Sequence, residues 1–180
     1  NILAIDTATP ALIVGVVCDG ATRSETVLND SHAHNELLVP ATLRMLDDAH
    51  LTDDVLVRSC GIGGWHVGQS ADRRAIAELQ ASGHDGTQHR AAQLGPEHDD
   101  ADLFVALDNG HIHDLVRHGI PSEKIRLLRS FDPSSPLGAD VDDPYYSNAA
   151  AFTEVHAQID AAMPGMIDWV KERLEHSSRR

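Results

Sequence analysis

Residues 55–82 read VLVRSCGIGGWHVGQSADRRAIAELQAS and contain a complete strand–turn–helix unit. Residues 55–59 (VLVRS) are a short β-rich run, and the glycine-rich stretch GIGG follows. Residues 71–82 (ADRRAIAELQAS) have helical spacing, with Gly83 as the stop. A strand that leads through glycines into a helix is the repeating unit of α/β folds, so this stretch predicts a parallel sheet covered by helices.

The same alternation continues toward the C-terminus. Residues 103–107 (LFVAL) and 125–128 (IRLL) are expected strands, and a short helix is expected around residues 113–117. Residues 152–174 form a long helical stretch, which the Pro164-Gly165 pair is expected to split. This alternation predicts a three-layer α/β sandwich with a mainly parallel sheet. Ligands of such sheets bind beyond the carboxyl ends of the strands.

The N-terminal segment has a different pattern. Residues 2–7 (ILAIDT), 12–18 (LIVGVVC) and 23–28 (RSETVL) are expected strands, and the Asp19-Gly20 turn separates the last two. Together they predict an antiparallel β-meander at the N-terminus of the α/β fold. Residues 35–49 (NELLVPATLRMLDDA) then show helical spacing.

Composition limits the partners and the compartment. The 28 acidic and 14 basic residues give a formal net charge of −14, which repels nucleic acid but leaves a small anionic substrate possible in one cleft. Cys18 and Cys60 are too few for a disulfide framework and favour a reducing compartment. No run approaches the roughly 18 apolar residues of a membrane span, and no signal peptide is visible. We expect a cytoplasmic protein that contacts neither membrane nor nucleic acid.

A family resemblance covers the larger part of the chain. Six segments, in the family's order and spacing, carry it: GGWHVGQSADRRA, HRAAQLGPEH, ADLFVALD, IRLLRSFDP, VDDPYY and PGMIDWV. From about residue 57 to 175 the chain resembles low-molecular-weight protein tyrosine phosphatases of actinobacteria. The resemblance implies hydrolysis of phosphotyrosine or aryl phosphates through a cysteinyl-phosphate, with no metal and no cofactor. In this chemistry a thiolate attacks phosphorus, an Arg and loop N–H groups hold the oxygens, and an Asp protonates the leaving phenolate.

The resemblance also assigns roles to individual residues. Asp143 would be the general acid. The substrate rim would comprise Trp65, His66, Tyr145 and Tyr146, and the braces behind the cysteine loop would be Ser59 and His89. Taken alone, an Asp-Pro pair is a common turn and adjacent tyrosines more often pack in a core. The His32/His34 and His111/His113 pairs are more typical of solvated histidines than of a metal site, since no C-x-x-C or H-E-x-x-H pattern accompanies them.

The nucleophile loop departs from the family pattern. The family requires C-x5-R-S after its first strand, and the nearest match is CDGATRS at residues 18–24, with one residue fewer between Cys18 and Arg23. In one interpretation Cys18 is the nucleophile and Arg23 the phosphate ligand. In the other, Cys18 ends a strand and Asp19-Gly20 is a hairpin turn. One residue is about 3.3 Å of chain, and Asp19 would repel a phosphate, so we expect the activity to be impaired or absent.

A second resemblance covers residues 1–56. The stretches ILAIDTATPALIVGVV and NDSHAHNELLVPATLRMLDDAHLT are similar to the start of the bacterial scaffold protein of tRNA threonylcarbamoyladenosine synthesis, which acts by pairing with a catalytic subunit. Residues 1–56 and 57–180 would then be regions of different ancestry in a natural or engineered chimera that can still fold as one unit. The alternative function is a non-catalytic scaffold or interaction protein. It would pair with a partner or a second copy through the meander and the helix at residues 35–49.

Overall fold

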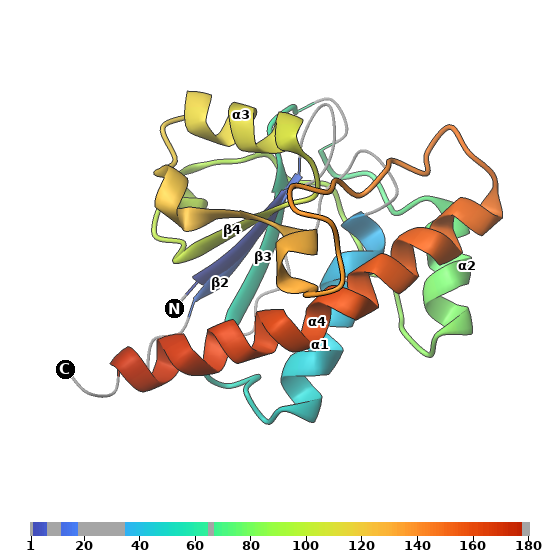
Figure 1. The fold of residues 1–180 in the computed structure, drawn as a ribbon. Helices are drawn as coiled ribbons and strands as arrows, with labels where there is room; N and C mark the ends of the chain where they lie inside the picture. The colour runs from blue at the N-terminus through green and yellow to red at the C-terminus, as the bar shows by residue number, and fades with distance from the viewer. Residues whose placement is uncertain (1, 7–11, 18–34, 65–66, 178–180) are drawn as a thin grey trace.

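The computed structural model of residues 1–180 describes the chain except residues 1, 7–11, 18–34, 65–66 and 178–180, and describes only the backbone of residues 2–6, 12–17 and 35–36 (Figure 1). The strands of the described chain are β1 (Ile2–Asp6), β2 (Leu12–Val17), β3 (Leu56–Gly61), β4 (Leu103–Ala106) and β5 (Ile125–Leu127). The longest ladders join β3 to β2, β2 to β1, β1 to β4 and β4 to β5. Single pairings also join β1 to β3 and β2 to β4, so the strands form one sheet.

The strand directions confirm a mainly parallel sheet. β1 is parallel to β3 and β4, and β4 is parallel to β5, whereas β2 is antiparallel to β1, β3 and β4. β1 and β2 pair with Ile2 opposite Val17 and Ile5 opposite Val14. The expected strand at residues 23–28 lies outside the described residues, so the complete N-terminal meander stays a prediction.

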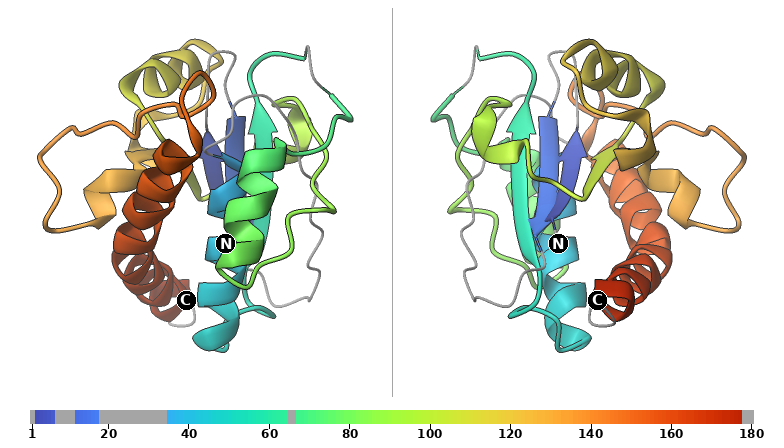
Figure 2. Two further views of the ribbon diagram at one scale, coloured as in Figure 1. Left: turned by 90° about the vertical axis from the view of Figure 1, so that its right-hand side faces the viewer. Right: turned by 90° about the vertical axis from the view of Figure 1, so that its left-hand side faces the viewer.

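Helices cover both faces of this sheet (Figures 1 and 2). The helices are α1 (Asn35–Asp48), α2 (Arg73–Ala81), α3 (Asn109–Arg117) and α4 (Ala149–Ser177), with 3-10 turns η1 (Pro96–His98), η2 (Ser122–Lys124) and η3 (Leu128–Phe131). Side chains of β4 alternate between the faces. Leu103 and Val105 pack into the larger core with α1, α2 and α4, while Phe104 and Ala106 pack into the smaller core with Leu115 of α3. The result is the expected three-layer arrangement.

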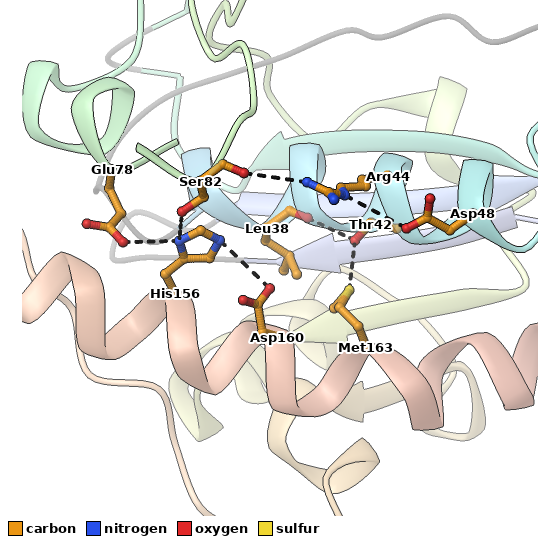
Figure 3. Close-up of polar contacts among 9 residues, drawn as sticks. All are labelled: Leu38, Thr42, Arg44, Asp48, Glu78, Ser82, His156, Asp160 and Met163. Atoms are coloured by element: carbon orange, nitrogen blue, oxygen red, sulfur yellow. Dashed lines mark hydrogen bonds and ion pairs between the residues drawn. The ribbon is translucent and has the colours of Figure 1, made fainter. Parts of the chain in front are cut away.

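The larger core joins α1 to α4. Leu37, Leu38 and Ile159 are completely buried in it, and the Thr42 hydroxyl donates to Leu38 O at 2.9 Å and lies 3.8 Å from Met163 Sδ (Figure 3). Side chains on both sides of the expected boundary at residues 56 and 57 therefore share one core. A different ancestry for the two regions stays a prediction.

Polar contacts join α2 to α4 at the C-terminal end of α2. The buried His156 places its Nδ1 3.1 Å from Ser82 Oγ and 3.2 Å from Glu78 Oε1 (Figure 3). Thr153 Oγ1 donates to the other oxygen of Glu78 at 2.9 Å. The two helices are thus held at this end by a buried polar group as well as by apolar packing.

Two helices differ from their sequence-based expectations. α4 is one continuous helix from Ala149 to Ser177, so the expected split at Pro164-Gly165 is wrong. Met163 and Met166, on either side of the pair, are buried, and this packing offsets the backbone hydrogen bond that Pro164 cannot make. Gly165 lets α4 approach η3, because a Cβ there would lie 2.1 Å from Phe131 O. α3 begins earlier than expected, because the Asp108 carboxylate accepts the His111 N–H at 2.8 Å and caps the helix.

No helix among the described residues is both long enough and apolar enough to span a membrane.

Candidate active site

The loop at residues 141–147, here called the acid loop, lies at the carboxyl edge of the sheet. Val141 N donates to Leu107 O at 2.8 Å, directly after β4 ends. Just before the loop, Asp140 Oδ1 accepts from Asn109 N at 3.0 Å and from Asn109 Nδ2 at 2.6 Å. These contacts fix the start of the acid loop at the edge where α/β sheets bind their ligands.

Asp143 is exposed on this loop and oriented by the backbone. Its Oδ1 accepts the Tyr145 N–H at 2.9 Å, and Ser147 N donates to Pro144 O at 2.9 Å to close the following turn. A cavity of about 170 Å³ opens between the loop and α4, lined by Asp142, Asp143, Pro144, Ser147, Ala151, Glu154, Val155 and Gln158. A carboxyl group held at the mouth of a small cavity can exchange a proton with a bound group.

The two tyrosines of the predicted rim lie beside Asp143. Their rings meet edge to face with 5.0 Å between centroids, and they are 40% and 88% exposed for Tyr145 and Tyr146. Exposed aromatic faces at a site edge can stack against an aryl group. The structure therefore places Asp143, Tyr145 and Tyr146 together, as the sequence led us to expect.

Sequence reasoning missed a residue that contacts this loop. Arg74, in the first turn of α2, donates to the backbone carbonyls of Tyr145 and Ser147, each at 2.8 Å. It also pairs with Asp72, the N-cap residue of the same helix. The Asp-x-Arg spacing at a helix start was visible in the sequence, but the contact across more than 70 residues was not.

Ser59 and His89 lie buried near the carboxyl end of β3. They are 1% and 3% exposed, and the segment after His89 runs along the end of the strand, where Gly61 N donates to Ala92 O at 2.9 Å. Burial, with a smaller contribution from Arg90, lowers the pKa of His89 to about 4. Within the described part of the chain, His89 Nε2 has no hydrogen-bond partner. The bracing role of both residues stays a prediction.

The remaining predicted site residues are Cys18, Arg23, Trp65 and His66, and they lie outside the described residues. β2, the strand before Cys18, ends at Val17, which pairs with Ile2 and Leu56 at the amino ends of β1 and β3. The described part of β2 therefore runs away from the edge that carries the acid loop. Cys60 is completely buried in the smaller core beneath α3.

A metal site finds no support in the described residues. They contain no group of three or more His, Cys, Asp or Glu side chains that could hold an ion. His111 instead belongs to the cap of α3, with its Nε2 3.2 Å from Asp108 Oδ2 and its Nδ1 3.3 Å from Asp108 N. Burial is the main cause that raises the pKa of Asp108.

Comparisons with known proteins bear on the family and the fold of this chain. Residues 41–177 match the family model for low molecular weight phosphotyrosine protein phosphatase. The low molecular weight protein-tyrosine phosphatase A of Mycobacterium tuberculosis (strain H37Rv) is 53% identical over 125 residues, which are 69% of this chain and 76% of the relative. A low molecular weight protein-tyrosine-phosphatase of Streptomyces coelicolor is 41% identical over 136 residues, covering 72% of this chain and 82% of the relative.

A solved structure shows the same fold. The crystal structure of YfkJ from Bacillus subtilis aligns with a TM-score of 0.72 over 86% of this chain and 99% of that one, at 22% identity. The family model and the two sequence relatives show that the chain belongs to the low-molecular-weight protein tyrosine phosphatase family. The family match begins at residue 41, inside α1, sixteen residues before the expected boundary at residue 57.

Proposed function

We propose that this chain holds the acid and substrate-rim half of a tyrosine phosphatase site, and that its hydrolysis of phosphotyrosine or aryl phosphates is impaired. The observation that carries the proposal is the contrast between an assembled acid loop and a nucleophile sequence that departs from the family. In these 180 residues neither Cys18 nor Cys60 is followed by Arg at the family's C-x5-R spacing. A displacement near 1 Å in a catalytic group can already reduce the rate on the order of 100-fold.

In the proposed reaction each residue has a defined role. A Cys18 thiolate would attack phosphorus as the P–O bond to the aryl group breaks, and Asp143 would give its proton to the departing phenolate. Water would then release phosphate from the cysteine, with Asp143 taking the proton back. Arg23 would hold the phosphate oxygens. Trp65, His66, Tyr145 and Tyr146 would contact the aryl ring, and Ser59 and His89 would support the loop.

The direction of β2 supports impairment rather than full activity. The strand ends at Val17 beside Leu56. Asp143 instead lies in the acid loop, whose first residue is bonded to Leu107 O beyond the opposite end of the sheet. β3 alone spans about 17 Å between these edges at roughly 3.3 Å per residue. A working site needs the sulfur and the carboxyl group on opposite sides of one phosphate group.

The test is turnover of p-nitrophenyl phosphate by the unmodified chain, Cys18→Ser and Cys60→Ser. We expect at most trace turnover that neither substitution changes and that vanadate does not inhibit. Vanadate-sensitive turnover that disappears in Cys18→Ser and persists in Cys60→Ser would show an intact nucleophile and overturn the impairment. A cooperative melt of all three proteins controls for folding.

The alternative is a non-catalytic interaction protein, with ancestry of residues 1–56 in the tRNA-modification scaffold family. The structure gives α1 little apolar surface for a partner, because Leu37, Leu38 and Leu46 are buried in the larger core. A partner would meet mainly its exposed Arg44, Asp47 and Asp48. We expect a monomer by light scattering, and a concentration-independent dimer would favour the interaction function.

A further inference from the structure

The acid loop has little regular structure of its own to hold Asp143. Residues 141–144 form no helix or strand, and the turn that follows them exposes Tyr145, Tyr146 and Ser147. Val141 and Pro144 are its buried residues. A loop with so few apolar anchors opens readily unless other contacts fix it.

Arg74 supplies such contacts through every side of its guanidinium group, an arrangement called here the Arg74 fork. Nη1 donates to Ser147 O at 2.8 Å, and Nη2 donates to Tyr145 O at 2.8 Å. Nε and Nη2 donate to the two oxygens of Asp72 at 3.0 and 2.8 Å. Because Asp72 also accepts the Arg74 N–H at 2.7 Å and caps α2, the fork is anchored on a rigid helix.

Aromatic rings hold the guanidinium from its faces. Arg74 Cζ lies 4.7 Å from the Phe152 ring centroid and 5.8 Å from that of Tyr145. Phe152 is almost completely buried in the first turns of α4. A planar cation between rings loses less freedom for each hydrogen bond that it makes than a flexible ammonium does.

The Arg74 fork acts on Asp143 through one residue. It fixes the backbone of Tyr145, and the Tyr145 N–H donates to Asp143 Oδ1 at 2.9 Å. Oδ1 therefore accepts from the backbone of the loop itself, and this hydrogen bond orients the carboxyl group. Displacing Tyr145 would release the carboxyl group from this orientation.

We infer that Arg74 is a positioning residue for Asp143, joining α2, the acid loop and α4 so that the carboxyl group is oriented before any substrate binds. The inference rests on the proposed role of Asp143 as general acid. The hydrogen bonds of the fork that lie within the described part of the chain join Arg74 to Asp72, Tyr145 and Ser147, so their effect on the loop can be measured without turnover.

The test measures amide hydrogen exchange by NMR, which requires no turnover. In Arg74→Met we expect exchange at the Tyr145 and Ser147 amides to rise about tenfold or more, since two charge-assisted hydrogen bonds to the loop are lost. Exchange at Val105 in β4 should change less than about twofold. Arg74→Lys keeps the charge but not the planar fork, so it should give an intermediate rise.

Arg73→Met is the matched control, because Arg73 is the exposed neighbour of Arg74 on the same helical turn. It should leave the exchange of the acid loop unchanged. Unchanged loop exchange in Arg74→Met would overturn the inference, and so would a rise shared equally by Val105, which would indicate a general loss of stability. Because at most trace turnover is expected of the unmodified chain, the exchange pattern tests the positioning role of Arg74 separately from the activity.

Discussion

The two halves of the predicted catalytic site are built differently. The acid half is a surface structure in which the Arg74 fork binds two loop carbonyls and Asp72, with aromatic rings packed against it. The bracing half, which comprises Ser59 and His89, is buried, and His89 Nε2 has no hydrogen-bond partner within the described part of the chain. The difference indicates that the described residues of the acid half hold one another through several hydrogen bonds, whereas the bracing half has hydrogen-bonding capacity that its described surroundings do not use.

The largest expected effect concerns the apolar support of the acid half. Phe152→Ala removes a buried ring from the larger core and from beneath the Arg74 fork, and should lower the free energy of unfolding by about 3–5 kcal/mol. Urea denaturation measures the loss. Phe104→Ala, in the smaller core on the other face, should cost a similar amount but leave exchange in the acid loop slow. Equal loosening of the loop by both substitutions would remove the distinction between the halves.

The bracing half should make the free energy of unfolding depend on pH. The pKa of His89 is lowered to about 4 in the folded protein, from an ordinary value of 6.5, chiefly by burial. The unfolded chain therefore takes up a proton as the pH falls below 6.5, while folded His89 stays neutral until about pH 4. The contribution of His89 to the free energy of unfolding is therefore fully present above pH 6.5. It falls by about 3 kcal/mol as the pH is lowered to 4, since one pKa unit corresponds to about 1.4 kcal/mol.

His89→Gln should flatten this part of the profile, measured by urea denaturation between pH 7 and 4.5. His84 and His98, whose pKa values burial also lowers, should leave a smaller residual slope. The exposed His113→Gln should leave the slope as in the unmodified chain. A slope that survives unaltered in His89→Gln would mean that His89 is protonated in the folded protein and has a hydrogen-bond acceptor after all.

The smallest expected change in stability concerns a residue outside both halves of the site, which serves as a control. His50 lies two residues after the end of α1 and has a φ of 56°, a left-handed conformation that favours glycine. His50→Gly should therefore raise the free energy of unfolding by about 0.5–1 kcal/mol. His50→Ala keeps the Cβ and should give no gain. Thermal melts compare the three proteins, and exchange of the acid loop should be the same in all.

Much of the fold could be predicted from local patterns. The strands at β3, β4 and β5 and the helices α1 and α2 lie within two or three residues of their expected positions, because burial of one face imposes a short repeat on the sequence. The start of α3 and the continuity of α4 were missed. The start of α3 depends on Asp108, whose carboxylate accepts the N–H of His111 three residues later. The continuity of α4 depends on its packing against η3, which a local sequence pattern does not specify.

The candidate site was predictable where it is made of neighbours in the chain. Asp143, Tyr145 and Tyr146 form one short motif, and the family pattern around them assigned their roles. The Arg74 fork was not predictable, because it joins residues 71 and 73 positions apart. His156 likewise meets Glu78 across 78 positions.

The sequence by itself determined the class of fold, the family and the departure at the nucleophile loop, since all three are matters of which residues stand at which spacing. Only the tertiary structure decided that β2 pairs with β3 as well as with β1, and that Arg74 holds the loop of Asp143. Strand pairing and long-range hydrogen bonds depend on which surfaces meet once the core has formed. Composition and periodicity do not specify which surfaces pack together.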